Sequence, residues 1–254
     1  MLDTEALAVA QRVLEIREKI LGTNHPAVAR SVNNLAVLSY VQGRYADAES
    51  FYRRSLAIFE KILGPNHPDV AISVNNLGSL YRDEGRFTDA EPLLRRSLAI
   101  REKTLGPDNP SIATALNSLA LLYESQGRYD DAEPLYNRSL AIREKSLGPD
   151  HPDVALSLNN LANLYQHRGR YADAEPLYKR SLTIKENARS TDHPSIALTL
   201  NNLADLYESQ GRFADAEPLY KRSFAIWEKA LGPDHPDVAK SLKSGASVQF
   251  PRSL

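Results

Sequence analysis

Apolar side chains recur every three or four residues through most of this chain, which is the spacing of an amphipathic α-helix. In residues 69–84 the apolar stripe consists of Val70, Val74, Leu77, Leu80 and Tyr81. A second stripe in residues 87–104 consists of Phe87, Ala90, Leu94, Leu98 and Ile100. Gly85 separates the two runs, as glycine does when it ends a helix in a left-handed conformation. The pattern therefore predicts two antiparallel helices joined by a tight turn.

This pair of helices repeats along the chain. A glycine recurs every 42 residues, at Gly43, Gly85, Gly127, Gly169 and Gly211. A His-Pro pair keeps the same step, at His25, His67, His151, His193 and His235, with Asn109 in the remaining place. Such units cannot bury their apolar faces alone, and stacking them buries a continuous core. The sequence thus predicts an all-α solenoid of antiparallel helical hairpins, in which function lies along a surface.

The period divides the chain into units. Residues 3–21 match a second helix, and full pairs follow at about 27–62, 69–104, 111–146, 153–188 and 195–230. A sixth first helix begins at Asp237 and loses the pattern at Lys243. We expect a capping helix over 237–246 and a disordered tail over 247–254. Residues 1–246 are expected to form a single solenoid.

Residues in both helices of each unit carry a family resemblance. Leu77-Gly78-x-x-Tyr81 followed by Ala90 resembles the tetratricopeptide pattern. The lengthened second helix and its Leu-Gly-Pro-Asp-His-Pro linker resemble the tetratricopeptide domain of kinesin light chains and their bacterial relatives, over roughly residues 3–242. The resemblance implies a right-handed α-solenoid, the tetratricopeptide superhelix, whose first helices line a concave groove.

Asparagines recur on the face that the resemblance places in this groove. The first of each pair is Asn33, Asn75, Asn117, Asn159 or Asn201, and the second is Asn34, Asn76, Asn160 or Asn202, with Ser118 as the exception. Asparagine is a poor residue inside a helix because its amide competes with the backbone. An amide both donates and accepts, so this ladder predicts hydrogen bonds to an extended peptide, each contributing about 0.5–1.5 kcal/mol. The alternative is that one asparagine of each pair bonds neighbouring helices and holds the repeats together.

The positions around the ladder indicate what the ligand would present. Arg30 and Arg82 lie toward the N-terminal units, and Leu121 and Asn163 lie further along the same face. We include these four residues with the asparagines in the predicted peptide-binding set. The pattern favours a ligand with an acidic part over the first units and an apolar part over the later ones.

Composition narrows the function classes. The chain is 42% hydrophobic and 25% charged, which is typical of a folded soluble protein. Its net charge of −1 creates no strong field for nucleic acid or an anionic membrane, and the absence of cysteine excludes thiolate chemistry. No stretch is long and apolar enough to cross a bilayer, and no signal peptide is recognised. We predict a cytoplasmic protein, or a piece of a larger one.

No motif predicts catalysis, a cofactor or a bound metal. The linker histidines come one per unit, too far apart to share a zinc ion through bonds of about 2 Å. Packing against or capping the following helix is the favoured role for them. We predict a non-enzymatic scaffold that binds a peptide or a partner segment. The alternative is a self-association or sensor array of a larger signalling protein, acting through the solenoid ends or the tail.

Overall fold

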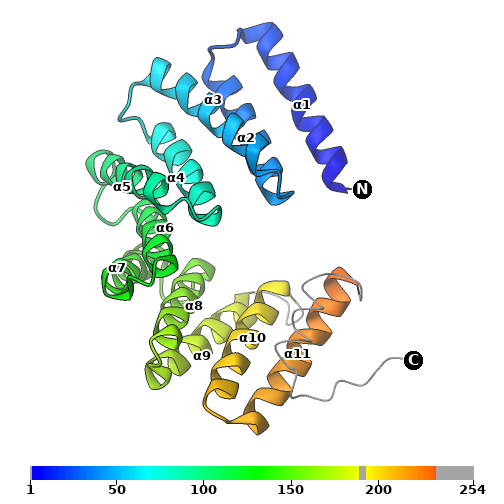
Figure 1. The fold of residues 1–254 in the computed structure, drawn as a ribbon, viewed down its shortest axis with the longest axis vertical. Coiled ribbons are helices and arrows are strands. Elements are labelled where there is room, and N and C mark those ends of the chain that lie inside the picture. Colours follow the sequence, from blue (N-terminus) through cyan, green and yellow to red (C-terminus); the bar gives the residue numbers. More distant parts are fainter. Residues whose placement is uncertain (1, 189–192, 233–254) are drawn as a thin grey trace. The chain divides into compact units, whose positions relative to one another are not determined.

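The computed structural model describes residues 2–188 and 193–232, and every regular element in them is an α-helix (Figure 1). The first helices of the repeats are α2 (Pro26–Val41), α4 (Pro68–Asp83), α6 (Pro110–Ser125), α8 (Pro152–His167) and α10 (Pro194–Ser209). The second helices are α1 (Leu2–Leu21), α3 (Tyr45–Leu63), α5 (Phe87–Thr104), α7 (Tyr129–Leu147), α9 (Tyr171–Ala188) and α11 (Phe213–Leu231). The all-α fold predicted from the sequence is confirmed.

The linkers start each first helix in the same way. Pro68 occupies the first turn of α4, where a missing N–H costs no hydrogen bond. The Nδ1 atom of His67 accepts the backbone N–H of Asp69 at 3.1 Å, which caps the helix. The same capping is seen at His25, His67, His151 and His193. The capping role expected of the linker histidines is thus confirmed at these positions, and His235 lies outside the described residues.

A glycine makes the tight turn of each hairpin possible. Gly85 has a φ of +73°, a left-handed conformation that is strained for residues with a Cβ atom. Its N–H donates to the carbonyl of Arg82 at 2.9 Å, and the N–H of Arg86 donates to the carbonyl of Tyr81 at 2.8 Å. These bonds satisfy the last carbonyls of α4. Helix α5 then begins at Phe87 and packs back against α4.

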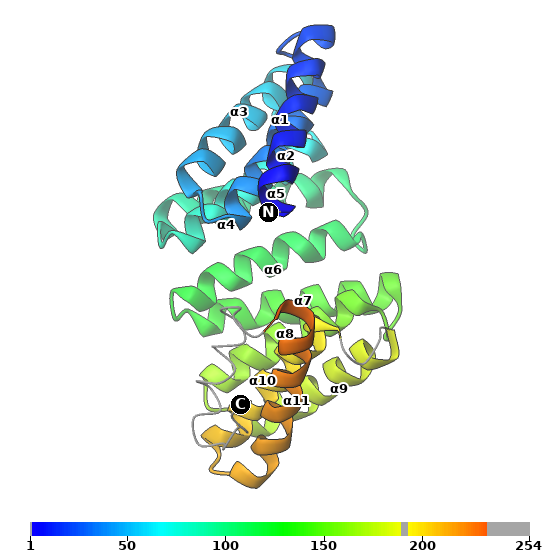
Figure 2. The same ribbon diagram turned by 90° about the vertical axis from the view of Figure 1, so that its right-hand side faces the viewer.

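The helices gather into two compact units, Met1–Leu135 and Tyr136–Leu254. In the first unit α2 packs with α3 and α4 with α5, and successive repeats meet through α3 and α4 and through α5 and α6. In the second unit α8 packs with α9 and α10 with α11, and α9 meets α10 (Figure 2). A single solenoid over 1–246 stays a prediction. The capping helix expected at 237–246 and the tail at 247–254 lie outside the described residues.

Small residues and one hydroxyl per repeat join the two helices of a hairpin. The Oγ atom of Ser55 donates to the carbonyl of Ala29 at 2.9 Å, and Ser97 donates to Ala71 at 2.8 Å. Ser181 and Ser223 make the same bonds in the second unit. Aliphatic side chains surround this contact in the first unit, among them Val28, Val32, Ile58, Val70, Val74 and Ile100. Each contributes about 1.5–3 kcal/mol when fully buried, so the stacked apolar stripes are the main source of stability.

Candidate binding face

The asparagines of the predicted ladder lie on the first helices of the repeats. In each of the two compact units, we call the surface formed by these first helices the first-helix face. Among the first asparagines of the pairs, Asn75 and Asn159 are buried, at 7% and 4% exposed, and the others are half-buried. Among the second asparagines, Asn34 is exposed and the rest are half-buried. The amides therefore differ in how much of them a ligand could reach.

Several of these amides bond to one another between repeats. The Nδ2 atom of Asn76 donates to Oδ1 of Asn33 at 3.2 Å, from α4 to α2. The Nδ2 atom of Asn202 lies 3.4 Å from Oδ1 of Asn159 and 3.2 Å from Oδ1 of Asn163, between α10 and α8. The second asparagine of one repeat thus reaches the first asparagine of the preceding repeat. At these positions the amides hold neighbouring helices together, which the alternative interpretation of the ladder requires.

The one departure from the ladder has a visible consequence. Ser118 stands where the other repeats carry the second asparagine, and its Oγ atom donates to the carbonyl of Thr114 within α6, at 3.1 Å. The Oδ1 atom of Asn75, which such an asparagine would reach, is buried and has no hydrogen-bond partner. An unsatisfied buried acceptor costs about 1–3 kcal/mol. The first unit therefore contains a defect in its chain of amides.

The four flanking residues of the predicted set lie in different surroundings. Arg30 is exposed and donates to Asp69 at 3.1 Å, and half-buried Arg82 pairs with Asp83 at 2.7 Å. Leu121 is half-buried. Asn163 accepts hydrogen bonds from the hydroxyl of Tyr178, at 2.5 Å, and from the next repeat. Large apolar side chains are also exposed on this face, namely Ile72, Leu156 and Leu198, at 46%, 45% and 50%.

A hollow of about 330 Å³ opens on the first-helix face of the first unit. Its lining comes from four helices and consists of Arg17, Arg30, Asn33, Asn34, Phe59, Asp69, Ile72 and Ser73. Three residues of the predicted set are therefore brought together here, Arg30, Asn33 and Asn34. Arg17 hydrogen-bonds Ser31 at 2.7 Å and the carbonyl of Ala27 at 3.3 Å, and it pairs with no carboxylate among the described residues. The hollow thus combines amides, an apolar wall and a cation without an acidic partner.

The position of Arg17 recurs at the end of each second helix. Phe59 follows it one repeat later, and Arg101, Arg143, Lys185 and Trp227 follow in turn. Arg101, Arg143 and Lys185 are buried and donate to backbone carbonyls at the start of the next first helix. Burial lowers the pKa of Arg101 and of Arg143. These cations hold successive repeats together. Arg17 makes the matching bonds from α1 to Ala27 and Ser31 of α2, but it is only half-buried and also lines the hollow.

The first-helix face of the second unit is acidic at α10. The hydroxyl of Tyr220 lies 2.5 Å from Oδ1 of Asp205 and 2.6 Å from Oε2 of Glu208. A phenol has one proton to donate, so the two carboxylates share it. Burial, opposed by the Tyr220 bond and reinforced by the nearby Glu208, raises the pKa of Asp205. Burial and the two carboxylates raise the pKa of Tyr220 as well.

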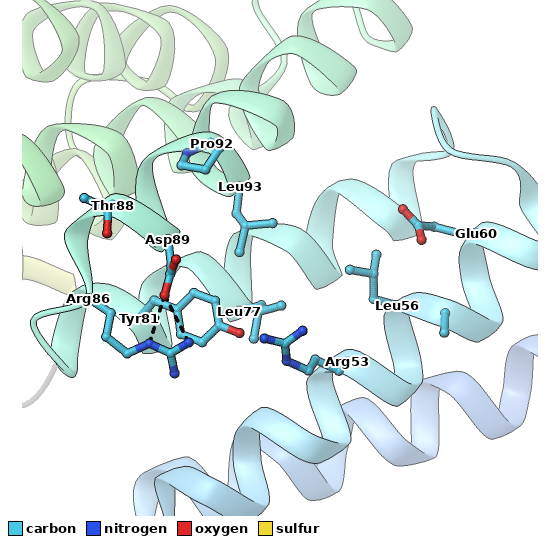
Figure 3. A pocket seen from close by; sticks show the side chains of 11 residues that line it. Arg53, Leu56, Glu60, Leu77, Tyr81, Arg86, Thr88, Asp89, Pro92 and Leu93 are labelled. Carbon is cyan, nitrogen blue, oxygen red and sulfur yellow. Dashed lines mark hydrogen bonds and ion pairs between the residues drawn. The ribbon is translucent and has the colours of Figure 1, made fainter.

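A second cleft, of about 490 Å³, lies between α3 and α5 of the first unit (Figure 3). The guanidinium carbon of Arg86 lies 3.9 Å from the ring centroid of Tyr81, and Arg86 also donates to Glu49 at 2.8 Å. The hydroxyl of Tyr81 donates to the same carboxylate at 2.7 Å. Burial raises the pKa of Glu49, but hydrogen bonds from Tyr81, Arg86 and Arg53 outweigh it and lower the pKa to about 2.

This arrangement is a staple between repeats. The same contacts join Glu91, Tyr123 and Arg128, and Glu175, Tyr207 and Arg212. Sequence reasoning assigned the Gly-Arg dipeptide to the turn and missed the staple. The recurrence of glutamate, tyrosine and arginine at one period was the available signal. Because Glu49 pairs with both Arg86 and Arg53, the cleft offers no unneutralised charge and is not the candidate site.

The described residues contain neither a metal-binding cluster nor a membrane-spanning helix. No group of three or more acidic or histidine side chains in them could hold a metal ion. No helix among them is both long enough and apolar enough to span a bilayer.

Comparison with known proteins places the repeats in a family. A family profile described as "Tetratricopeptide repeat" matches residues 3–60, 31–103, 69–145 and 111–187, and a second profile of the same description matches 196–237. Among solved structures, the crystal structure of BtubC (BKLC) from P. vanneervenii is similar, with a TM-score of 0.74, 24% identity, and coverage of 100% of this chain and 97% of that one. A comparison with curated proteins found no match.

Two further crystal structures are of a kinesin light chain-like protein from Podosopora anserina with nearly identical TPR-like repeats. The first has a TM-score of 0.66 and 29% identity, over 82% of this chain and 98% of that one. The second is a variant of that protein with a single substitution, and it has a TM-score of 0.67 and 29% identity, over 81% and 97%. The likeness to kinesin light chain repeats expected from the linker motif is confirmed.

Proposed function

The chain belongs to the tetratricopeptide repeat family of protein–protein interaction scaffolds, and we propose that its first-helix face binds an extended segment of a partner protein. The observation that carries this proposal is the hollow in the first unit. Side chains of α1, α2, α3 and α4 meet there, and amides, an exposed isoleucine and two arginines face the same space. A peptide backbone needs amide partners, and its side chains need apolar and charged contacts.

The amides contribute unequally in this proposal. Asn33 is tied to Asn76 but is half-buried, and Asn34 is exposed, so both are within reach of a ligand. Asn75 and Asn159 are buried and act on the ligand through the helices that they position. The accessible asparagines therefore bond the peptide, and the buried ones keep the repeats in register.

The hollow also indicates the chemistry of the ligand. Arg30 is already paired with Asp69, whereas Arg17 has only uncharged partners among the described residues. A half-buried cation with uncharged partners favours a carboxylate more than a solvated surface cation does. Ile72 offers an apolar contact on the same wall. We infer a ligand with an acidic residue beside an apolar one.

The proposal is tested by selecting peptides from a display library with the wild-type chain and measuring their affinity by fluorescence anisotropy. Ile72→Asp places a charge on the binding face, and Ile62→Asp places one at a 39% exposed position of a second helix. Both sites are exposed, so both variants should keep the wild-type circular dichroism spectrum. We expect Ile72→Asp to weaken binding at least tenfold and Ile62→Asp to leave it unchanged. Equal binding by all three proteins, or no peptide selected, overturns the proposal.

A separate substitution, at Arg17, tests the preference for an acidic ligand. Phe59 stands one repeat after Arg17, so the chain itself accommodates an aromatic residue at that position. Arg17→Phe should fold normally and should lose the discrimination between a selected peptide and its Asp-to-Asn or Glu-to-Gln analogue. If the variant still distinguished the two peptides, a cation other than Arg17 would bind the carboxylate. The proposal of the binding face itself would still stand.

A further inference from the structure

Helix α1 carries two apolar faces, and the described structure covers only one of them. Leu7 and Leu14 are buried against the core of the first unit, where α1 packs on α2 (Figure 1). The other face carries residues spaced by four, three and four, which is one helical stripe. It consists of Val9, Val13, Ile16 and Ile20, which are 59%, 38%, 45% and 72% exposed. Four large aliphatic side chains in one exposed stripe are typical of an interaction surface.

The internal repeats show what this face packs against when it is covered. The 42-residue period aligns Val13 and Ile16 of α1 with Ser55 and Ile58 of α3. In α3 these two are 0% and 6% exposed, because α2 packs on them. The equivalent residues of α5, α9 and α11 are buried in the same way, each by the first helix of its own hairpin. Val13 and Ile16, in the middle of the stripe, thus match half of a hairpin interface, whose natural complement is a first helix.

The sequence repeats the pattern of a first helix once more, beyond the five first helices that the structure describes. Pro236-Asp-Val-Ala-Lys-Ser-Leu242 matches Pro68-Asp-Val-Ala-Ile-Ser-Val74 and Pro152-Asp-Val-Ala-Leu-Ser-Leu158. At the positions of Val238, Ala239 and Leu242, those two helices carry side chains that are fully buried. Residues 236–246 therefore carry the apolar pattern of a first helix. A first helix is the partner that the exposed stripe on α1 does not have in the described structure.

We propose that α1 of one copy binds residues 236–246 of a second copy, so that the two segments complete a hairpin between molecules. Each copy uses one surface at each end, and the two surfaces differ. Such a heterologous contact joins molecules head to tail into open chains, or into a ring if the rotation closes. The repeat pattern then continues from one molecule to the next, because nearest-neighbour contacts alone stabilise repeat arrays.

A substitution at one position distinguishes completion of a hairpin from nonspecific hydrophobic association of the apolar stripe. The other second helices place a serine where α1 has Val13, and that serine donates to a carbonyl of the first helix. Val13→Ser supplies this donor, whose acceptor would be the carbonyl of Ala239 in the second copy. The substitution makes the stripe less apolar and yet should maintain or strengthen association. Association driven by apolar area alone would become weaker.

The test is sedimentation velocity on the 254-residue chain over a hundredfold range of concentration. We expect the wild-type mass to rise with concentration from that of the 28.2 kDa monomer to beyond the dimer. Ile16→Asp disables one end and Leu242→Asp disables the other, so each variant alone should remain monomeric. Mixed together they should form a one-to-one dimer and nothing larger, because each retains one working surface.

Four results would overturn the proposal. They are a wild-type monomer at every concentration, association that persists in Ile16→Asp, a dimer of Leu242→Asp alone, and a mixture that stays monomeric. The third would indicate two α1 helices paired with each other. Circular dichroism of both variants excludes unfolding as the cause, and an Ile62→Asp variant controls for an added charge at an exposed isoleucine outside the stripe.

Discussion

Gly78, in the middle of α4, gives the sharpest test of how each hairpin packs. The other first helices carry alanine at its position, namely Ala36, Ala120, Ala162 and Ala204. The residue facing it across the hairpin is Leu94, where the other second helices carry Tyr52, Tyr136, Tyr178 and Tyr220. A Cβ atom on Gly78 would lie 2.8 Å from Cγ and 2.9 Å from Cδ2 of Leu94, closer than van der Waals contact allows. The branched leucine therefore occupies the space that an alanine methyl takes elsewhere.

The two effects of Gly78→Ala oppose each other. Replacing a glycine inside a helix by alanine stabilises it by about 0.8–1 kcal/mol. Forcing a methyl group against a packed side chain costs about 1–3 kcal/mol. The substitution should therefore lower the free energy of unfolding by about 0–2 kcal/mol, instead of raising it. Adding Leu94→Tyr recreates the pair found in the other repeats and should recover the loss, with a coupling of about 1–3 kcal/mol between the sites.

Guanidinium unfolding followed by circular dichroism, on the wild type, both single variants and the double variant, measures this coupling. Hydrogen exchange of α4 amides locates the effect, because repeats of one array can open separately. A Gly78→Ala protein about 1 kcal/mol more stable than the wild type, with additive effects in the double variant, would refute the packing argument.

Two further substitutions test the contacts between repeats. The folded-state pKa of Glu49 is about 2, below its ordinary value of 4.5, so its stabilisation is complete above pH 4.5 and is lost as the pH falls toward 2. Glu49→Gln should lower the melting temperature at pH 7, and the difference from the wild type should shrink as the pH falls to 2; a difference independent of pH would contradict the ionic role. Ser118→Asn should supply the donor that Asn75 lacks and raise stability by about 0.5–1.5 kcal/mol in thermal melts, whereas Ser118→Ala should give no gain.

The sequence was sufficient for the helices and their pairing. Proline at the start and glycine at the end fixed the limits of each first helix, because each acts through the backbone of its own neighbourhood. The stripes of apolar residues indicated the buried faces for the same reason. These rules depend only on residues that are close in sequence, so the helices predicted from them agree with the structure.

The partners of the polar side chains could not be read in the same way. Arg82 was expected to face a ligand, and its pairing with Asp83 beside it was not foreseen. The bond from Asn76 to Asn33 depends on how far one hairpin is rotated against the next. The staple at Glu49 joins three residues from two repeats, so no single motif contains it. Such contacts follow from geometry between repeats, which a one-dimensional pattern leaves undetermined.

The most direct test of the proposed binding face is to map where a selected peptide lies on the first unit. The peptide would carry a photoreactive group beside its acidic residue, and mass spectrometry would identify the residues that it labels. We expect labelling around the hollow, at α1, α2 and α4, with Ile72 and Asn34 among the sites. Labelling confined to the cleft between α3 and α5, near Leu56 and Leu93, would contradict it and assign recognition to the second helices.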